Sequence, residues 1–194
     1  MGQTTVPFSI VESCMQTYNG IAKTFHWLIF ALMSVAFAVG FYMGDLPLSP
    51  AKLQLVSWHK WCGVTIFVLV LLRLTWRLMH PPPPQTAPMP RWQLQASEIM
   101  HRLLYLLMLA MPLSGWLMSS AKGVPTVWFG LIQLPDLLEK NKPLGKALEA
   151  VHETIGFIIL ALVAVHVIAA LKHHFVDRDD VLARMLPGIK PLSK

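Results

Sequence analysis

Charged side chains are scarce in this chain of 194 residues. Asp, Glu, Lys and Arg make up 13% of the sequence and hydrophobic residues 55%, whereas about a quarter of a typical soluble domain is charged. This composition excludes an ordinary soluble domain and indicates a membrane protein. The net charge of +6 fits contact with anionic lipid. No cluster of basic and aromatic residues indicates a nucleic-acid partner.

Cysteine is scarce as well, with Cys14 and Cys62 only. We expect these two near opposite membrane faces, so a disulfide between them is not expected. The sequence has no CxxC or CxxCH motif, which argues against a zinc–cysteine site and against covalently attached haem. The first apolar run lacks a short apolar region followed by a small-residue cleavage site, so we expect it to remain as a membrane anchor.

Long apolar runs are what the sequence has in abundance. Residues 25–43, 103–120 and 154–171 carry no charge, and a fourth run, 58–79, has its basic residues near its ends. Each is long enough to span a bilayer. The sequence therefore predicts an all-α integral membrane protein, a bundle of four transmembrane helices. We expect a single membrane domain over 1–194, divided into a polar N-terminal arm 1–22, helices at about 24–43, 57–79, 98–119 and 143–175, and a cytoplasmic tail 176–194.

Basic residues indicate the orientation. All the arginines lie in the terminal segments or near the connection between the second and third helices. Connections rich in Lys and Arg mark the cytoplasmic side of a membrane protein. We therefore expect both termini in the cytoplasm.

Two histidines, His152 and His166, lie fourteen residues apart in the last apolar run. In a helix their rings point within roughly 40° of each other and lie roughly 21 Å apart along the axis. Histidine within a membrane helix is costly and marks a functional site, and haem iron is commonly held by axial histidine. A single histidine at a helix end is more often an interfacial polar residue, but this pair favours one ligand for each of two haems.

The outer haem has a clear second ligand. His59 begins the second helix from outside, and its depth matches that of His152 near the outer end of the fourth helix. Gly63 and Gly156 each follow one of these histidines by four residues, one turn inward on the same helix face. The missing side chains would let a porphyrin edge lie against the backbone.

The inner haem has several candidate ligands. His166 and His173 lie on nearly the same face of the fourth helix, about two turns apart. His26, at the mouth of the first helix, is the natural partner for either, and His101 is the other contender. Spacing alone does not choose among the four. For His80, beside a polyproline run, and for His174, solvent exposure is the simpler interpretation.

Short segments around these histidines together resemble the bacterial cytochrome b561 family. They are Phe25-His26-Trp27, Trp58-His59-Lys60, Met100-His101-Arg102-Leu-Leu-Tyr105, Val151-His152-Glu153-Thr154, and Val165-His166 to Lys172-His173-His174-Phe175. The match runs from about Thr24 to Pro187. The resemblance implies a four-helix cytochrome of the bacterial inner membrane with two haems b. It also implies His26 with His166 as the inner axial pair, and His59 with His152 as the outer pair.

Two axial imidazoles leave iron without an open position, so each haem would relay single electrons. We expect electrons to pass from a periplasmic-side donor to membrane quinone. Four outer lysines would form a positive funnel for a small anionic donor: Lys60, Lys140, Lys142 and Lys146. One branch of the resembled family oxidises superoxide at the periplasmic face and reduces ubiquinone. A solvated face paired in part with Asp136, Glu139 and Glu149 is an equally good interpretation of these lysines.

A quinone also needs protons, for which we expect a site at the inner end formed by His101, Arg102 and His173. The same side chains would equally suit hydrogen bonding to haem propionates. The alternative function is a cytochrome b subunit that anchors a partner dehydrogenase or hydrogenase to the quinone pool. A membrane transporter or ion carrier that uses these histidines is the alternative from another class.

Overall fold

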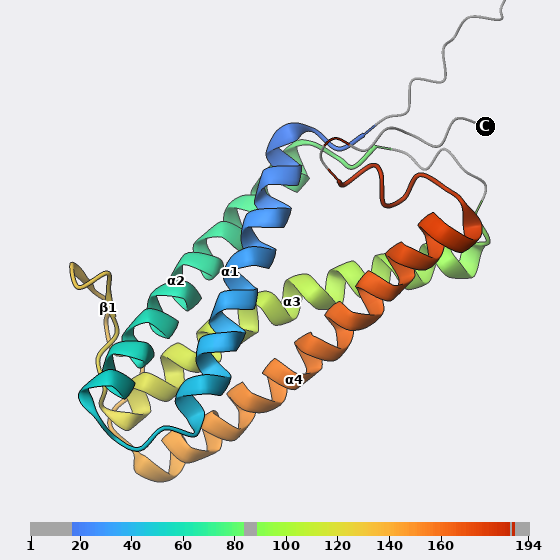
Figure 1. Cartoon of the computed structure of the whole chain (residues 1–194). Coiled ribbons are helices and arrows are strands. Elements are labelled where there is room, and N and C mark those ends of the chain that lie inside the picture. Colours follow the sequence, from blue (N-terminus) through green and yellow to red (C-terminus); the bar gives the residue numbers. More distant parts are fainter. Residues whose placement is uncertain (1–16, 84–88, 187, 189–194) are drawn as a thin grey trace, which may run out of the picture.

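Four long helices make up most of the protein. The structure is a computed structural model, and it describes residues 17–83, 89–186 and 188. In chain order the helices are α1 (Gly20–Gly44), α2 (Pro50–Met79), α3 (Arg91–Lys122) and α4 (Lys142–Lys172), and α4 continues into a turn of π-helix, η1 (His173–Asp177) (Figure 1). All four are long and apolar enough to cross a membrane. The predicted fold, an all-α bundle of four membrane helices, is confirmed; Cys14 lies outside the described residues.

The helices begin earlier than the apolar runs suggest, and in α1, α2 and α4 the side chain of a capping residue starts the helix in the preceding segment. Ser49 accepts a hydrogen bond from the backbone N–H of Lys52, and Pro50 is the first residue of α2. Proline suits this position because its missing N–H would have no helical partner there. Asn141 caps α4 in the same way, with Pro143 in the first turn. Prolines that break the hydrophobic pattern therefore start helices here.

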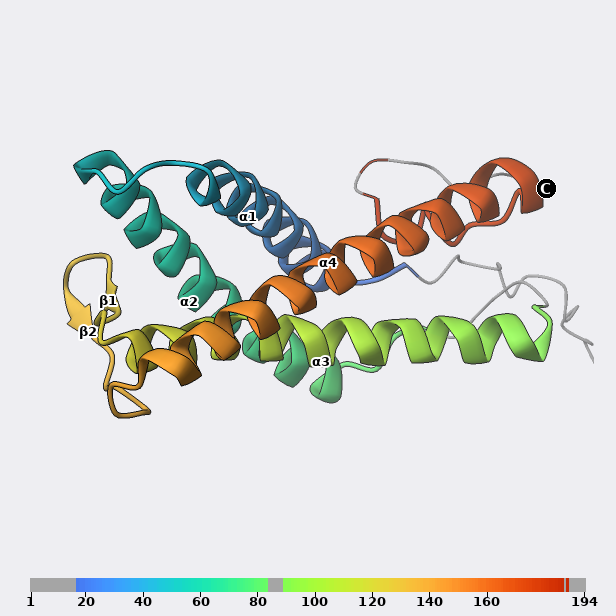
Figure 2. The same cartoon turned by 90° about the horizontal axis from the view of Figure 1, so that it is seen from below.

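The helices pack as two pairs. Contacts are most extensive between α3 and α4 and between α1 and α2, and α2 joins the pairs by packing on α3. Figure 2, seen from below, shows the two pairs. The buried core lies at the junction and consists of Ile29, Ile66, Val70, Leu104 and Met108. Many large apolar side chains remain exposed outside this core, as expected where lipid replaces water as the solvent.

A short β-hairpin follows α3 and lies beside α2. Its strands, β1 (Val127–Trp128) and β2 (Ile132–Gln133), are antiparallel. The indole N–H of Trp61 donates to the carbonyl of Val127 at 2.7 Å, and that of Trp128 donates to Thr65 Oγ1 at 3.2 Å. The sequence predicted only a long connection here. We call this end of the molecule, where α2 and α4 begin, the hairpin end.

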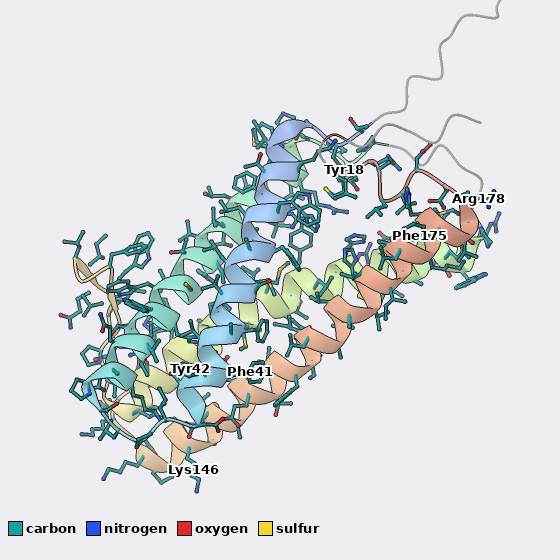
Figure 3. The ribbon with its side chains drawn as sticks, viewed as in Figure 1. Tyr18, Phe41, Tyr42, Lys146, Phe175 and Arg178 are labelled. Carbon is teal, nitrogen blue, oxygen red and sulfur yellow. The ribbon has the colours of Figure 1, made fainter. Side chains whose placement is uncertain are left out.

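The opposite end is closed by the segment after η1. The indole N–H of Trp27 donates to the carbonyl of Met185 at 3.1 Å, and Arg184 Nη2 donates to the carbonyl of Pro83 at 2.6 Å. These bonds tie the C-terminal segment to α1 and to the chain that follows α2. Figure 3 shows Tyr18 and Arg178 at this end and Lys146 at the other. We call it the terminal end.

Candidate functional site

Two pairs of histidines face each other inside the bundle, at two levels along α4. At the hairpin end, His59 of α2 and His152 of α4 have ring centroids 6.1 Å apart. At the terminal end, His26 of α1 and His166 of α4 have ring centroids 6.3 Å apart. The structure therefore brings together the four histidines that the sequence singled out as haem ligands, with α4 contributing one to each pair.

The spacing within each pair suits a metal held between two imidazoles. With metal–nitrogen bonds of about 2 Å, two rings on opposite sides of one metal have centroids about 6 Å apart. The separations of 6.1 Å and 6.3 Å match this distance. The residues present at both levels fit bis-imidazole ligation.

At the hairpin end the hydrogen bonds of the two imidazole rings leave Nε2 free to bind a metal. Nδ1 of His59 lies 3.0 Å from the carbonyl oxygen of Ala36, and Nδ1 of His152 lies 3.1 Å from that of Met111 and 3.0 Å from Ser114 Oγ. A carbonyl oxygen only accepts, so each Nδ1 carries the proton and donates. Nε2 is then unprotonated and available to a metal, in the manner that outer-shell partners usually fix a histidine ligand.

A small, mainly apolar pocket adjoins this pair. Besides His59 and His152, it is lined mainly by apolar groups, among them Met33, Phe37, Gly63, Met108 and Ile159. A Cβ built on Gly63 would meet nothing within 4 Å, so this glycine borders open space, as the sequence suggested. The space at Gly156 is instead filled by Met111 and Phe37, 3.3 Å and 3.6 Å from a built Cβ.

The terminal-end pair has a third histidine beside it. The ring centroid of His101, on α3, lies 5.4 Å from that of His166. His101 Nδ1 lies 2.6 Å from the carbonyl oxygen of Ser97. His26 Nδ1 is buried and has no hydrogen-bond partner within the described part of the chain. A buried polar atom left in this way points to a group that binds there.

His173, the fourth inner candidate, belongs to a different cluster. Its Nδ1 lies 2.7 Å from Asp179 Oδ2 and 3.1 Å from Asp177 Oδ2, and Asp177 also pairs with Lys172 at 2.7 Å. Arg102 pairs with Glu98 on the exposed surface of α3. The three residues of the expected quinone or proton site, His101, Arg102 and His173, thus each have different hydrogen-bond or ion-pair partners.

Two arginines that the sequence treated as interfacial lie near the terminal-end histidines. Arg73 and Arg77, one turn apart on α2, place their guanidinium carbons 5.5 Å and 5.7 Å from the centroid of the Tyr105 ring. Tyr105 follows His101 by four residues, one turn further along α3. The sequence could have indicated this position, since Arg73 directly follows the charge-free run of the second helix. Guanidinium groups here suit carboxylates such as haem propionates.

The four lysines expected to attract an anion lie at the hairpin end in two roles. Lys60 Nζ donates to the carbonyls of Val124 and Pro125 at 3.1 Å and 3.2 Å and so holds the hairpin. The side chain of Lys140 packs over Gly123. Lys142 and Lys146 are exposed in the first turns of α4. Within residues 17–83, 89–186 and 188, none of the four forms an ion pair with a carboxylate; Lys122 instead pairs with Glu149 at 2.6 Å.

Comparisons with known proteins agree with this geometry. The family model described as prokaryotic cytochrome b561 matches residues 17–188. Cytochrome b561 homolog 2 of Escherichia coli (strain K12) is 34% identical over 175 residues, which cover 88% of this chain and 92% of the relative. Cytochrome b561 homolog 1 of the same organism is 30% identical over 176 residues, 89% and 99% of the two chains. The probable superoxide oxidase CybB of Yersinia pestis is 31% identical over 170 residues, 88% and 96% of the two chains.

The resemblance inferred from the histidine segments is thereby confirmed. The family match implies that the protein binds b-type haem, takes part in electron transfer and lies in a bacterial membrane. This chain belongs to the prokaryotic cytochrome b561 family.

Proposed function

We propose that the protein is a di-haem cytochrome that moves single electrons between a donor at the hairpin end and membrane quinone. The observation that carries the proposal is the pair of facing histidines at each of two levels along α4. Haem b bound there supplies a one-electron ferric/ferrous couple. Imidazole on both faces leaves no open position, which favours electron relay over oxygen chemistry.

His59 and His152 are the ligands at the hairpin end, each oriented by a carbonyl of a neighbouring helix. His26 and His166 are the ligands at the terminal end. One observation favours His26 over His101: its separation from His166, 6.3 Å, is close to the 6.1 Å of the other pair. His101, 5.4 Å from His166, lies beside the terminal-end pair and serves hydrogen bonding to propionate or quinone.

The hairpin end faces the periplasm in this proposal, and both termini lie in the cytoplasm. The arginines of the C-terminal segment and those near the connection between α2 and α3 support that orientation. Quinone reduction then belongs to the terminal end, where His101, Arg102 and His173 offer protons and hydrogen bonds.

Superoxide is the proposed donor. A relative that is 31% identical is named a probable superoxide oxidase, and the exposed Lys142 and Lys146 provide positive charge at the hairpin end. Two superoxide anions would give two molecules of dioxygen and two electrons. One quinone takes these electrons with two protons to become a quinol.

The haem content of the purified protein tests the di-haem proposal. We expect a reducible b-type spectrum and two haems per chain, with one haem lost in His59→Ala or His152→Ala and the other lost in His26→Ala or His166→Ala. A wild-type protein without a reducible b-type band, or with one haem per chain, would contradict it.

Anaerobic rapid mixing tests the donor. Superoxide should reduce the haems within the mixing experiment, and the rate should fall as ionic strength rises. Absence of reduction would eliminate superoxide as the donor while leaving the di-haem cytochrome intact. Copurification of a large periplasmic protein would then favour the alternative, a membrane anchor for a partner dehydrogenase or hydrogenase.

A further inference from the structure

The ring of His59 rests against a glycine of the neighbouring helix. A Cβ built on Gly40 of α1 would lie 3.2 Å from His59 Cε1 and 3.5 Å from its Nδ1. The carbonyl oxygen that accepts from this Nδ1 belongs to Ala36, one helical turn before Gly40. The edge of the imidazole that carries Cε1 and Nδ1 therefore lies in a gap bounded by one carbonyl and one glycine.

The ring of His152 is held in the same way by another helix. A Cβ built on Gly115 of α3 would lie 3.0 Å from His152 Cε1 and 3.3 Å from its Nδ1. The accepting carbonyl belongs to Met111, again four residues before the glycine. Helices α1 and α3 thus present the same spacing of glycine and carbonyl to the two histidines of one pair; at His152 the hydroxyl of Ser114 also lies 3.0 Å from Nδ1.

Helix geometry explains why glycine is needed at this spacing. The carbonyl of residue i already accepts from the N–H of residue i+4, and its second lone pair can take a side-chain donor. At Met111 the hydroxyl of Ser114 also donates to this carbonyl, at 2.7 Å. Every Cα–Cβ bond in an α-helix tilts toward the N-terminus, so a side chain at i+4 leans over that carbonyl. Without a Cβ at this position, an imidazole from another helix can reach the second lone pair.

We propose that Gly40 and Gly115 are positioning residues for the hairpin-end haem: each lets a ligand histidine bond through Nδ1–H to the carbonyl one turn earlier. The inference rests on the proposed function, because it gives His59 and His152 the role of axial ligands. It goes beyond the ligands themselves and assigns their orientation to two residues that touch neither iron nor substrate.

The Nδ1–H bond connects these glycines to the redox potential. A strong hydrogen bond from Nδ1 makes the imidazole a more basic ligand, which favours ferric over ferrous iron and lowers the potential. A methyl group at Gly40 or Gly115 would push the ring away from the carbonyl and weaken that bond. The potential of the hairpin-end haem should therefore rise, and that of the terminal-end haem should stay unchanged.

The test compares Gly40→Ala and Gly115→Ala with the matched control Gly44→Ala in the full-length, haem-loaded protein. A Cβ built on Gly44 would meet nothing within 4 Å. Redox titration and low-temperature EPR report the two haems separately, and the step that disappears in His59→Ala identifies the hairpin-end haem. We expect a change of about tenfold in its ferric/ferrous equilibrium, equivalent to 59 mV for one electron, with shifted EPR g-values. The effect should be larger for Gly115→Ala, where the built contact is closer.

A purely structural role would give another result. Gly→Ala inside a helix normally stabilises the helix, so without the ring contact both variants should behave like Gly44→Ala. Unchanged potentials, g-values and haem content would therefore overturn the proposal. Loss of the hairpin-end haem alone, with two haems retained in Gly44→Ala, would support it. If Gly115→Ala does not fold, Gly40→Ala decides. Failure of the ligand assignment appears separately, as two haems retained in His59→Ala.

Discussion

The chemistry of each histidine in this protein depends on which ring nitrogen its surroundings leave free. His59 and His152 direct Nδ1–H to carbonyls of other helices, which leaves Nε2 for a metal. His101 directs Nδ1 to the carbonyl of Ser97 on its own helix, so it also has a free Nε2. Because His101 also lies close to His166, it is the alternative to His26 as the second haem ligand at the terminal end.

Replacement of His101 tests that assignment. His101→Ala should keep two haems per chain, because the proposed ligand pair is His26 with His166. The haem-to-protein ratio of the purified variant, measured from the b-type spectrum, gives the answer. His26→Ala is the matched comparison and should fall to one haem. The reverse pattern, with haem lost only in His101→Ala, would make His101 the ligand.

The open space at Gly63 leads to a second prediction at this scale. A leucine at this position would extend into the cavity beside His59 and His152, so Gly63→Leu should lose the hairpin-end haem and keep the other. The haem-to-protein ratio should fall from two to about one, with the remaining potential that of the terminal-end haem. Gly44→Leu, where the built Cβ also meets nothing within 4 Å, should keep both haems. Two haems in Gly63→Leu would mean that haem does not use this space.

Spacing singled out His152 and His166 and matched His59 to His152 in depth, because spacing within one helix fixes both direction and depth. It did not choose among His26, His101, His166 and His173, since contacts between helices decide which rings meet; the pair His26 with His166 came from the family resemblance. Gly40 and Gly115 were missed for the same reason: each glycine acts on a histidine of another helix, and nothing in its own helix marks it. Arg73 was judged from its place in a run, although its neighbour Tyr105 comes from α3.

At the scale of elements, the four helices followed from their apolar runs, and the differences lie at their ends. The pattern treated Pro50 as part of a break, whereas it is the first residue of α2 after the Ser49 cap. The hairpin was not expected because its strands have two residues each, too short for an alternating pattern. Side chains of α2, chiefly Lys60 and Trp61, hold it in place.

The π-helical turn η1 carries a prediction about quinone. His173 lies between Asp177 and Asp179, so it has partners for taking up and passing on a proton. His173→Ala should keep two haems but slow their reoxidation by added quinone, by about a hundredfold if His173 is a general acid. The exposed His80 provides the control, and His80→Ala should reoxidise at the wild-type rate. Wild-type reoxidation in His173→Ala would remove His173 from the proton path and leave it a structural role.

At the scale of the whole molecule, two helix pairs meet through the histidines and enclose two levels of one site. α4 connects those levels, since His152 and His166 belong to the same continuous helix. Apolar side chains such as Met33, Phe37 and Ile159 line the pocket beside the hairpin-end pair. Two histidine pairs at opposite ends of one helix suit the proposed electron transfer across the bilayer. In that proposal superoxide reaches the hairpin end, where Lys142 and Lys146 are exposed.

The lysines of the hairpin end therefore carry the last prediction. Lys140→Gln, Lys142→Gln and Lys146→Gln in one protein should keep two haems but slow their reduction by superoxide, since a positive field raises the encounter rate of an anion by about tenfold or more. The dependence on ionic strength should flatten at the same time, because screening acts on the charges that were removed. Lys60 is left in place, as it holds the hairpin. Lys23→Gln, at the terminal end, changes charge without changing this field and should leave both rate and salt dependence as in the wild type. Equal rates in the triple variant and the wild type would show that these lysines are only a solvated surface, and superoxide would then need another route to the haem.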